Sequence, residues 1–293
     1  MTFRLAFATL TLALVLPLSA CDESGSASLN EAATISDAQV ARQNGDFSTS
    51  VRLLEGALTA NPESAPVRTE LAVTILARED LNLLDLDRIA QFIADGVGGL
   101  ATGDAPVARG ASTCRYATDA TARRFDPTAV AGFPTITASR AEIDRVIALL
   151  EPVLPAALRS FNACVAIGPG GELVYDRAAA TAQLRASGLS NAQISQLLAT
   201  NALARFMRAY LFVTTDVPQQ TSWYRLADGS IGVCADNSDA LVAQTRPAVE
   251  TLGTALLSLD TRARSFGGAS DIVTRATDAF ADIRDGLGQY CAG

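Results

Sequence analysis

Residues 44–62 read NGDFSTSVRLLEGALTANP and contain a turn, an amphipathic helix and a stop signal, in that order. The Gly45-Asp46 pair predicts a tight corner after a preceding helix over residues 32–43. Pro62 ends the second helix, because proline cannot continue a helix and disfavours the helical form of the residue before it. The stretch therefore predicts a helical hairpin. Its second helix would bury Val51, Leu54, Ala57 and Leu58 on one face.

This hairpin resembles a tetratricopeptide repeat. The resemblance is carried by Ala41, the Gly45-Asp46-Phe47 corner, Ala57 and Asn61-Pro62. In that family, small residues let the two helices pack closely, and the proline ends the unit. Residues 65–78 resemble the first helix of a second repeat, and the pattern fails after Glu79. About three repeats are normally needed to bury a continuous core, so the rest of the chain must supply packing. A generic helical hairpin is the alternative.

The beginning of the chain resembles a bacterial lipoprotein signal. Arg4 precedes an apolar run over residues 5–18, and Leu18-Ser19-Ala20 comes directly before Cys21. The run is shorter than the roughly 20 residues that a spanning helix needs. In that family the thiol corresponding to Cys21 carries a diacylglycerol, which implies a membrane anchor facing the periplasm. The choice between inner and outer membrane stays open, and an ordinary signal peptide is the alternative.

The charged residues restrict the possible functions. The 293 residues carry 23 basic and 31 acidic side chains, a net charge of −8, and without residues 1–20 the charge is −9. Such acidity disfavours nucleic acid, whose binding depends on neutralising phosphates. All 23 basic residues are arginine, and histidine is absent. These absences exclude Ser-His-Asp triads, imidazole zinc sites, P-loops and pyridoxal phosphate lysines. We expect no cofactor and no metal.

Four further cysteines suggest two disulfides, as is common in exported proteins. They are Cys114, Cys164, Cys234 and Cys291. Three connectivities are possible, and the pairs Cys114–Cys164 and Cys234–Cys291 are preferred because each closes a nearby segment. Free buried thiols are the alternative.

The chain divides into five segments by pattern. They are a signal peptide (1–20), a flexible tether (21–30), a repeat-like helical region (31–97), an irregular loop segment (98–138) and a helical domain with two small β-hairpins (139–293). In the last segment, capping boxes at Ser139–Glu142 and Ser190–Gln193 predict helix starts. Hairpins are expected over residues 164–175 and 221–234, and further helices over residues 83–93, 177–187, 238–259 and 270–286. The expected fold is mainly α, with antiparallel helical hairpins stapled by disulfides.

Two groups of residues are candidates for binding. Helix phase places Gln39, Arg42, Arg68 and Glu70 along a groove formed by the first helices of the repeats. Trp223 and Tyr224 form a possible recognition pair, since aromatic residues are enriched at binding hot spots, although ordinary hairpin packing is the commoner role.

These observations favour a lipid-anchored scaffold of the cell envelope. It would bind another envelope protein, a peptide or a small ligand, as an assembly or transport accessory, and it would not be an enzyme. The alternative is a hydrolase that acts on envelope polysaccharide with two carboxylates, which would lie about 5–9 Å apart in a deep cleft.

Overall fold

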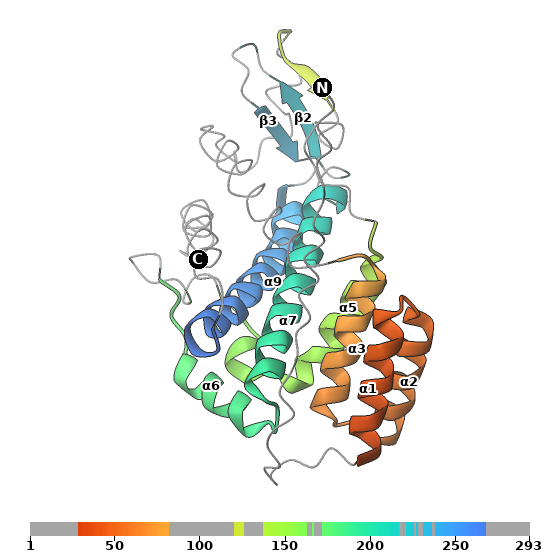
Figure 1. Cartoon of the computed structure of the whole chain (residues 1–293). Helices are drawn as coiled ribbons and strands as arrows, with labels where there is room; N and C mark the ends of the chain where they lie inside the picture. The colour runs from red at the N-terminus through yellow and green to blue at the C-terminus, as the bar shows by residue number, and fades with distance from the viewer. Residues whose placement is uncertain are drawn as a thin grey trace, which may run out of the picture.

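The structure of the chain is a computed structural model that is mainly helical, as predicted. One group of helices packs beside a pair of long helices, and a small sheet lies beyond one end of that pair (Figure 1). The residues that the structure describes are 29–81, 120–125, 137–162, 166, 172–216, 219, 221–225, 227, 231–235 and 238–267.

The predicted helical hairpin forms helices α1 (Leu29–Gln43) and α2 (Phe47–Ala60). Gly45 in the corner has a φ of +78°, which glycine adopts without steric cost. The Asp46 carboxylate caps α2 by accepting a hydrogen bond of 3.0 Å from the Thr49 backbone N–H. The Ser64 hydroxyl caps the next helix, α3 (Ala65–Arg78). Because the connections are short, the three helices run antiparallel, and each packs against the other two.

Helix α5 (Arg140–Leu150) packs against α3 and ends where two prolines follow. Pro152 and Pro155 replace further α-helix with two 3₁₀ turns, η3 (Glu151–Val153) and η4 (Ala156–Leu158). Ion pairs between Arg78 and Glu142 and between Arg145 and Glu55 connect α5 to α3 and α2.

The long pair consists of α7 (Asn191–Leu211) and α9 (Ser238–Ser265), and the short α6 (Arg177–Ala186) packs against both. The predicted capping box opens α7: the Ser190 hydroxyl accepts from the Gln193 N–H at 3.3 Å, and the Gln193 side chain accepts from the Ser190 N–H at 2.9 Å. A π-helical turn, η5 (Phe212–Asp216), follows α7. Helix α9 extends six residues beyond its predicted end at residue 259.

The other predicted capping box is wrong, although its helix starts where expected. Ser139 is the N-cap of α5, but its side chain makes no capping hydrogen bond. Its backbone N–H instead donates to Glu79 Oε2 at 2.9 Å, and Glu142 pairs with Arg78 at 2.9 Å. Partners from a neighbouring segment thus replace the local bonds.

A three-stranded antiparallel sheet has the order β1 (Arg123–Phe125), β2 (Thr221–Arg225) and β3 (Ile231–Ala235). Strands β2 and β3 form the predicted second hairpin. Strand β1 lies within residues 98–138, for which the sequence predicts an irregular segment, and it pairs with a strand about 100 residues later. Local glycine and proline patterns do not reveal such a contact. Apart from residues 120–125, 137 and 138, this segment lies outside the described residues. Of the other predicted hairpin, the described residues show one backbone bond, from Val174 N–H to Ala166 C=O at 2.8 Å.

Several predictions lie outside the described residues. They are the signal peptide with Cys21, most of the tether, the helices over residues 83–93 and 270–286, and the cysteines Cys114, Cys164 and Cys291. Cys234 lies in β3, and its side chain is also outside the description. The disulfide pairs therefore stay predictions, and no disulfide is seen in the described part of the chain. None of the described helices is both long enough and apolar enough to cross a membrane.

Candidate functional site

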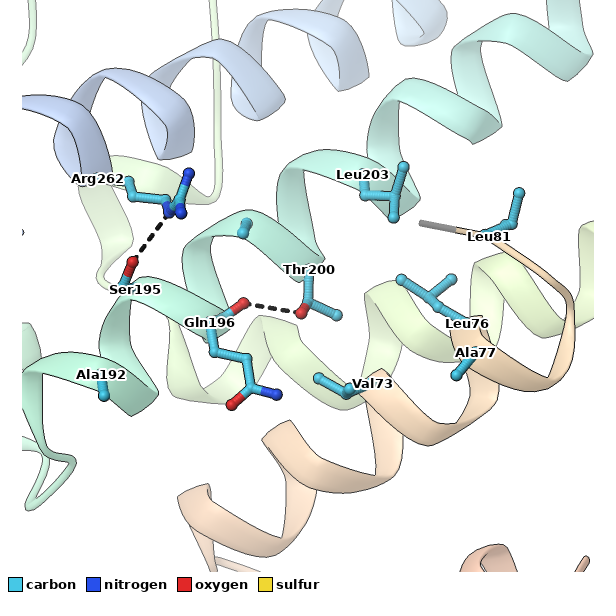
Figure 2. A pocket seen from close by; sticks show the side chains of 11 residues that line it. Val73, Leu76, Ala77, Leu81, Ala192, Ser195, Gln196, Thr200, Leu203 and Arg262 are labelled. Atoms are coloured by element: carbon cyan, nitrogen blue, oxygen red, sulfur yellow. Dashed lines mark hydrogen bonds between the residues drawn. The ribbon is translucent and has the colours of Figure 1, made fainter. Parts of the chain in front are cut away.

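A pocket of about 390 Å³ opens between α3 and α7, and α9 contributes to one end of it (Figure 2). This volume lies in the range of small-molecule sites. The segment around α3 contributes Val73, Leu76, Ala77 and Leu81 to the lining. Helix α7 contributes Ala192, Ser195, Gln196, Ala199, Thr200 and Leu203, and α9 contributes Arg262.

The pocket arises from residue size and spacing on two helices. On α7 the lining residues recur every three or four positions, so they share one face of the helix. Ala192 and Ala199 on that face, and Ala77 on α3, have side chains too short to fill the space between the helices. The short alanine side chains therefore make the lining apolar and also leave the space between the helices empty.

One end of the pocket is polar. The Arg262 Nε–H donates to Ser195 Oγ at 2.9 Å, which fixes the plane of the guanidinium and leaves both terminal amino groups out of that bond. Among the described residues, no carboxylate forms an ion pair with Arg262. Leu76, Leu81 and Leu203 lie toward the other end (Figure 2). The pocket is therefore amphipathic, with a positive charge at one end and a hydrocarbon wall at the other.

The described lining offers little for acid–base chemistry. It contains no Asp or Glu, and the Thr200 hydroxyl donates to the Gln196 backbone carbonyl at 2.7 Å. The two carboxylates that a polysaccharide hydrolase needs are thus not assembled at this pocket. Nor do the described residues contain a cluster of three metal-binding side chains.

Three of the four predicted groove residues meet in one polar cluster between α1 and α3. Gln39 Nε2 donates to Glu70 Oε2 at 3.1 Å, and Arg42 Nη2 forms an ion pair with Glu70 Oε1 at 2.8 Å. Glu70 is buried. Arg68 lies apart from them and donates to the backbone carbonyls of Pro62 and Leu149. All four side chains hold helices together, and a binding role for them stays a prediction.

Trp223 and Tyr224 are both half-buried in β2 and face opposite sides of the sheet, because neighbouring residues on a strand alternate. Trp223 pairs with Phe125 of β1 and Val233 of β3, whereas Tyr224 pairs with Arg124 and Gly232. The two aromatic residues therefore do not form one contiguous patch. Recognition by either residue stays a prediction.

A second cluster of polar side chains surrounds Asp260 on α9 and has a structural role. Its carboxylate accepts a hydrogen bond of 2.7 Å from the Tyr175 hydroxyl and pairs with Arg177 and Arg264. Burial is the main cause that raises the pKa of Tyr175. Since the Asp260 carboxylate is buried and has three cationic or hydroxyl partners, the cluster fastens residues 175–177 to α9.

Sequence reasoning missed the pocket residues. The alanine and serine positions on α7 carry a signal, since a face of small residues facing a neighbouring helix leaves space. The sequence gives no signal for Arg262, because the helix is predicted to end at residue 259. The hydrogen-bond partner of Arg262, Ser195, is also 67 residues away in the chain.

Fold and pocket together describe a mainly helical protein with an amphipathic pocket between α3 and α7. Comparison with protein-family models, curated proteins and solved structures returned no match to this chain.

Proposed function

We propose that this chain is a lipid-anchored protein of the bacterial cell envelope, facing the periplasm, that binds a small amphipathic ligand carrying one carboxylate. The observation that carries the proposal is the position of Arg262. Its guanidinium is fixed by Ser195 at the polar end of an apolar pocket, and no carboxylate of the described chain neutralises it. The anchor itself rests on the lipoprotein-like sequence before Cys21.

The charge and shape of the pocket select the ligand class. Guanidinium groups bind carboxylates through paired, charge-assisted hydrogen bonds, and the free amino groups of Arg262 suit this geometry. Burying a hydrocarbon chain against the leucines contributes about 25 cal/mol for each Å² removed from water. At roughly 30 Å³ for each water-sized group, 390 Å³ holds about a dozen non-hydrogen atoms, which is the size of decanoate.

Helices α1–α3 would be the scaffold of this binding protein. Their antiparallel packing is what a repeat-like array requires, and α3 presents one edge to α2 and another to α7. In this role, the array positions the α3 wall of the pocket.

Titration calorimetry with decanoate and the uncharged decanol tests the proposal. Arg262→Gln should weaken decanoate binding by about tenfold to a hundredfold, because a hydrogen bond to a charged group contributes about 1.5–3 kcal/mol. The same variant should leave decanol binding unchanged. Arg52→Gln is the matched control, since Arg52 is an exposed arginine on α2.

Ala77→Leu should weaken the binding of both ligands, because its larger side chain occupies the pocket. The proposal fails if neither ligand binds the unmodified chain. It also fails if Ala77→Leu binds both ligands as tightly as the unmodified chain does, because the pocket is then not the binding site.

A further inference from the structure

Arg205 lies on the side of α7 away from the pocket. It follows the pocket residue Leu203 by two positions, which is about 200° around the helix. Its side chain is buried, with only 7% of its surface exposed. Arginine is almost never buried to this degree unless it is paired.

The hydrogen bonds around Arg205 leave one of its donors without a partner. Arg205 Nε donates to Asn201 Oδ1 at 3.0 Å, and Asn201 Nδ2 donates to Ser258 Oγ on α9 at 2.8 Å. The Ser258 hydroxyl donates in turn to the Thr254 carbonyl at 3.3 Å. The Arg205 Nη2 group is buried and has no hydrogen-bond partner. The chain of bonds therefore reaches Arg205 through Nε and leaves the buried Nη2 of the same guanidinium without an acceptor.

The charge of Arg205 is also left without compensation. Arginine stays protonated in proteins, although burial lowers the pKa of Arg205. Glu151 is the acidic residue whose charge acts on Arg205, but it is exposed at the start of η3 and forms no hydrogen bond or ion pair with it. Asn201 offers only the dipole of an amide. A buried cation with such weak compensation is costly, so the site favours an anionic guest.

We propose that Arg205 Nη2 binds a small inorganic monoanion, of the size of chloride, buried between α7 and α9. The guest is small because Arg205 is itself almost fully buried and its partner Asn201 has no exposed surface. It is singly charged because one guanidinium faces it. A water molecule would satisfy the hydrogen bond, but it would leave the charge unbalanced.

The test is thermal unfolding of the full chain in sodium chloride and in sodium gluconate at equal ionic strength. Gluconate is too large for the site. With chloride about tenfold above its dissociation constant, the unfolding midpoint should rise by about 3–6 °C relative to gluconate. Arg205→Met keeps the apolar stem of the side chain and removes its charge, so the chloride-specific rise should disappear.

Two further variants separate this site from other causes. Arg208→Met removes a cation one turn further along α7, where Arg208 pairs with Asp144, and it should keep the chloride response. Glu151→Gln should keep the response too. An equal rise in Arg205→Met would identify a general salt effect and overturn the proposal. A third outcome is that chloride does not change the stability of the unmodified chain, whereas Glu151→Gln lowers it. That result would show that Glu151 supplies the counter-charge of Arg205.

A measurement on the unmodified chain covers the case in which Arg205→Met does not fold. Bound chloride broadens the chloride nuclear resonance, and bromide should compete for the site and remove the broadening. Absence of any broadening at millimolar chloride would overturn the proposal.

Discussion

Replacing Gly253 by alanine should destabilise the protein, because the new methyl group would enter the space of a buried phenylalanine ring. A Cβ atom at position 253 of α9 would lie 2.1 Å, 2.2 Å and 2.4 Å from three ring carbons of Phe161. These distances are far below van der Waals contact, so the ring must move. Phe161 is buried, with 4% of its surface exposed.

Two opposing effects decide the magnitude. Alanine favours an α-helix over glycine by about 1 kcal/mol, which alone would stabilise the variant. Displacing the Phe161 ring costs about 1–3 kcal/mol in overpacking, and partial loss of its burial takes away some of the roughly 1.5–3 kcal/mol that a buried phenylalanine contributes. The steric effect is the larger one. We expect the free energy of unfolding to fall by about 1–3 kcal/mol.

The assay is urea unfolding followed by circular dichroism, with Gly56→Ala as the matched control. Gly56 lies within α2, and a Cβ atom there would meet nothing within 4 Å. That variant should therefore gain about 0.5–1 kcal/mol from helix propensity. In a Phe161→Ala background, Gly253→Ala should no longer destabilise, because the ring is absent. A stabilising effect of Gly253→Ala comparable to that of Gly56→Ala would refute the reasoning.

Four further variants test the helix caps and the polar cluster. Ser190→Ala should lower the free energy of unfolding by about 1 kcal/mol, whereas Ser139→Ala, which removes no capping bond, should change it little in the same urea assay. Hydrogen bonds from Thr49 hold the pKa of the Asp46 carboxylate below 3.8, so its ionised form stabilises the fold above this pH, and the stabilisation is lost as the pH falls through the folded-state pKa. Asp46→Asn should therefore show a smaller loss of stability on acidification, and equal acid profiles would count against this cap. Glu70→Ala should lower the free energy of unfolding by about 2 kcal/mol, because it leaves Arg42 and Gln39 of α1 without their carboxylate partner. A change within experimental error would show that the cluster contributes nothing to stability.

Local signals in the sequence predicted most helix boundaries. Proline and glycine ended helices at the expected positions, as Pro62 and Gly45 show. The Ser190 capping box formed because both of its partners lie within one turn and no outside group competes for them. The corresponding bonds at Ser139 did not form, since Glu142 forms an ion pair with Arg78 on another helix.

The candidate site could not be predicted in the same way. Gln39, Arg42 and Glu70 are predicted along a groove, and in the structure Gln39 and Arg42 both bind Glu70 across two helices. Sequence phase shows which face of a helix a side chain occupies, but it does not show which helix covers that face. That requires the packing of α1 on α3.

By itself the sequence determined the mainly helical class, the corner after α1, the caps and stops of individual helices, and the chemistry excluded by the absence of histidine and lysine. These properties depend on residues within a few positions of one another or on composition alone. Only the tertiary structure decided that Arg262 meets Ser195 at the pocket and that Arg205 is buried and linked through Asn201 to Ser258. The physical reason is that burial and pairing are properties of the space between helices, which residues far apart in the chain create together.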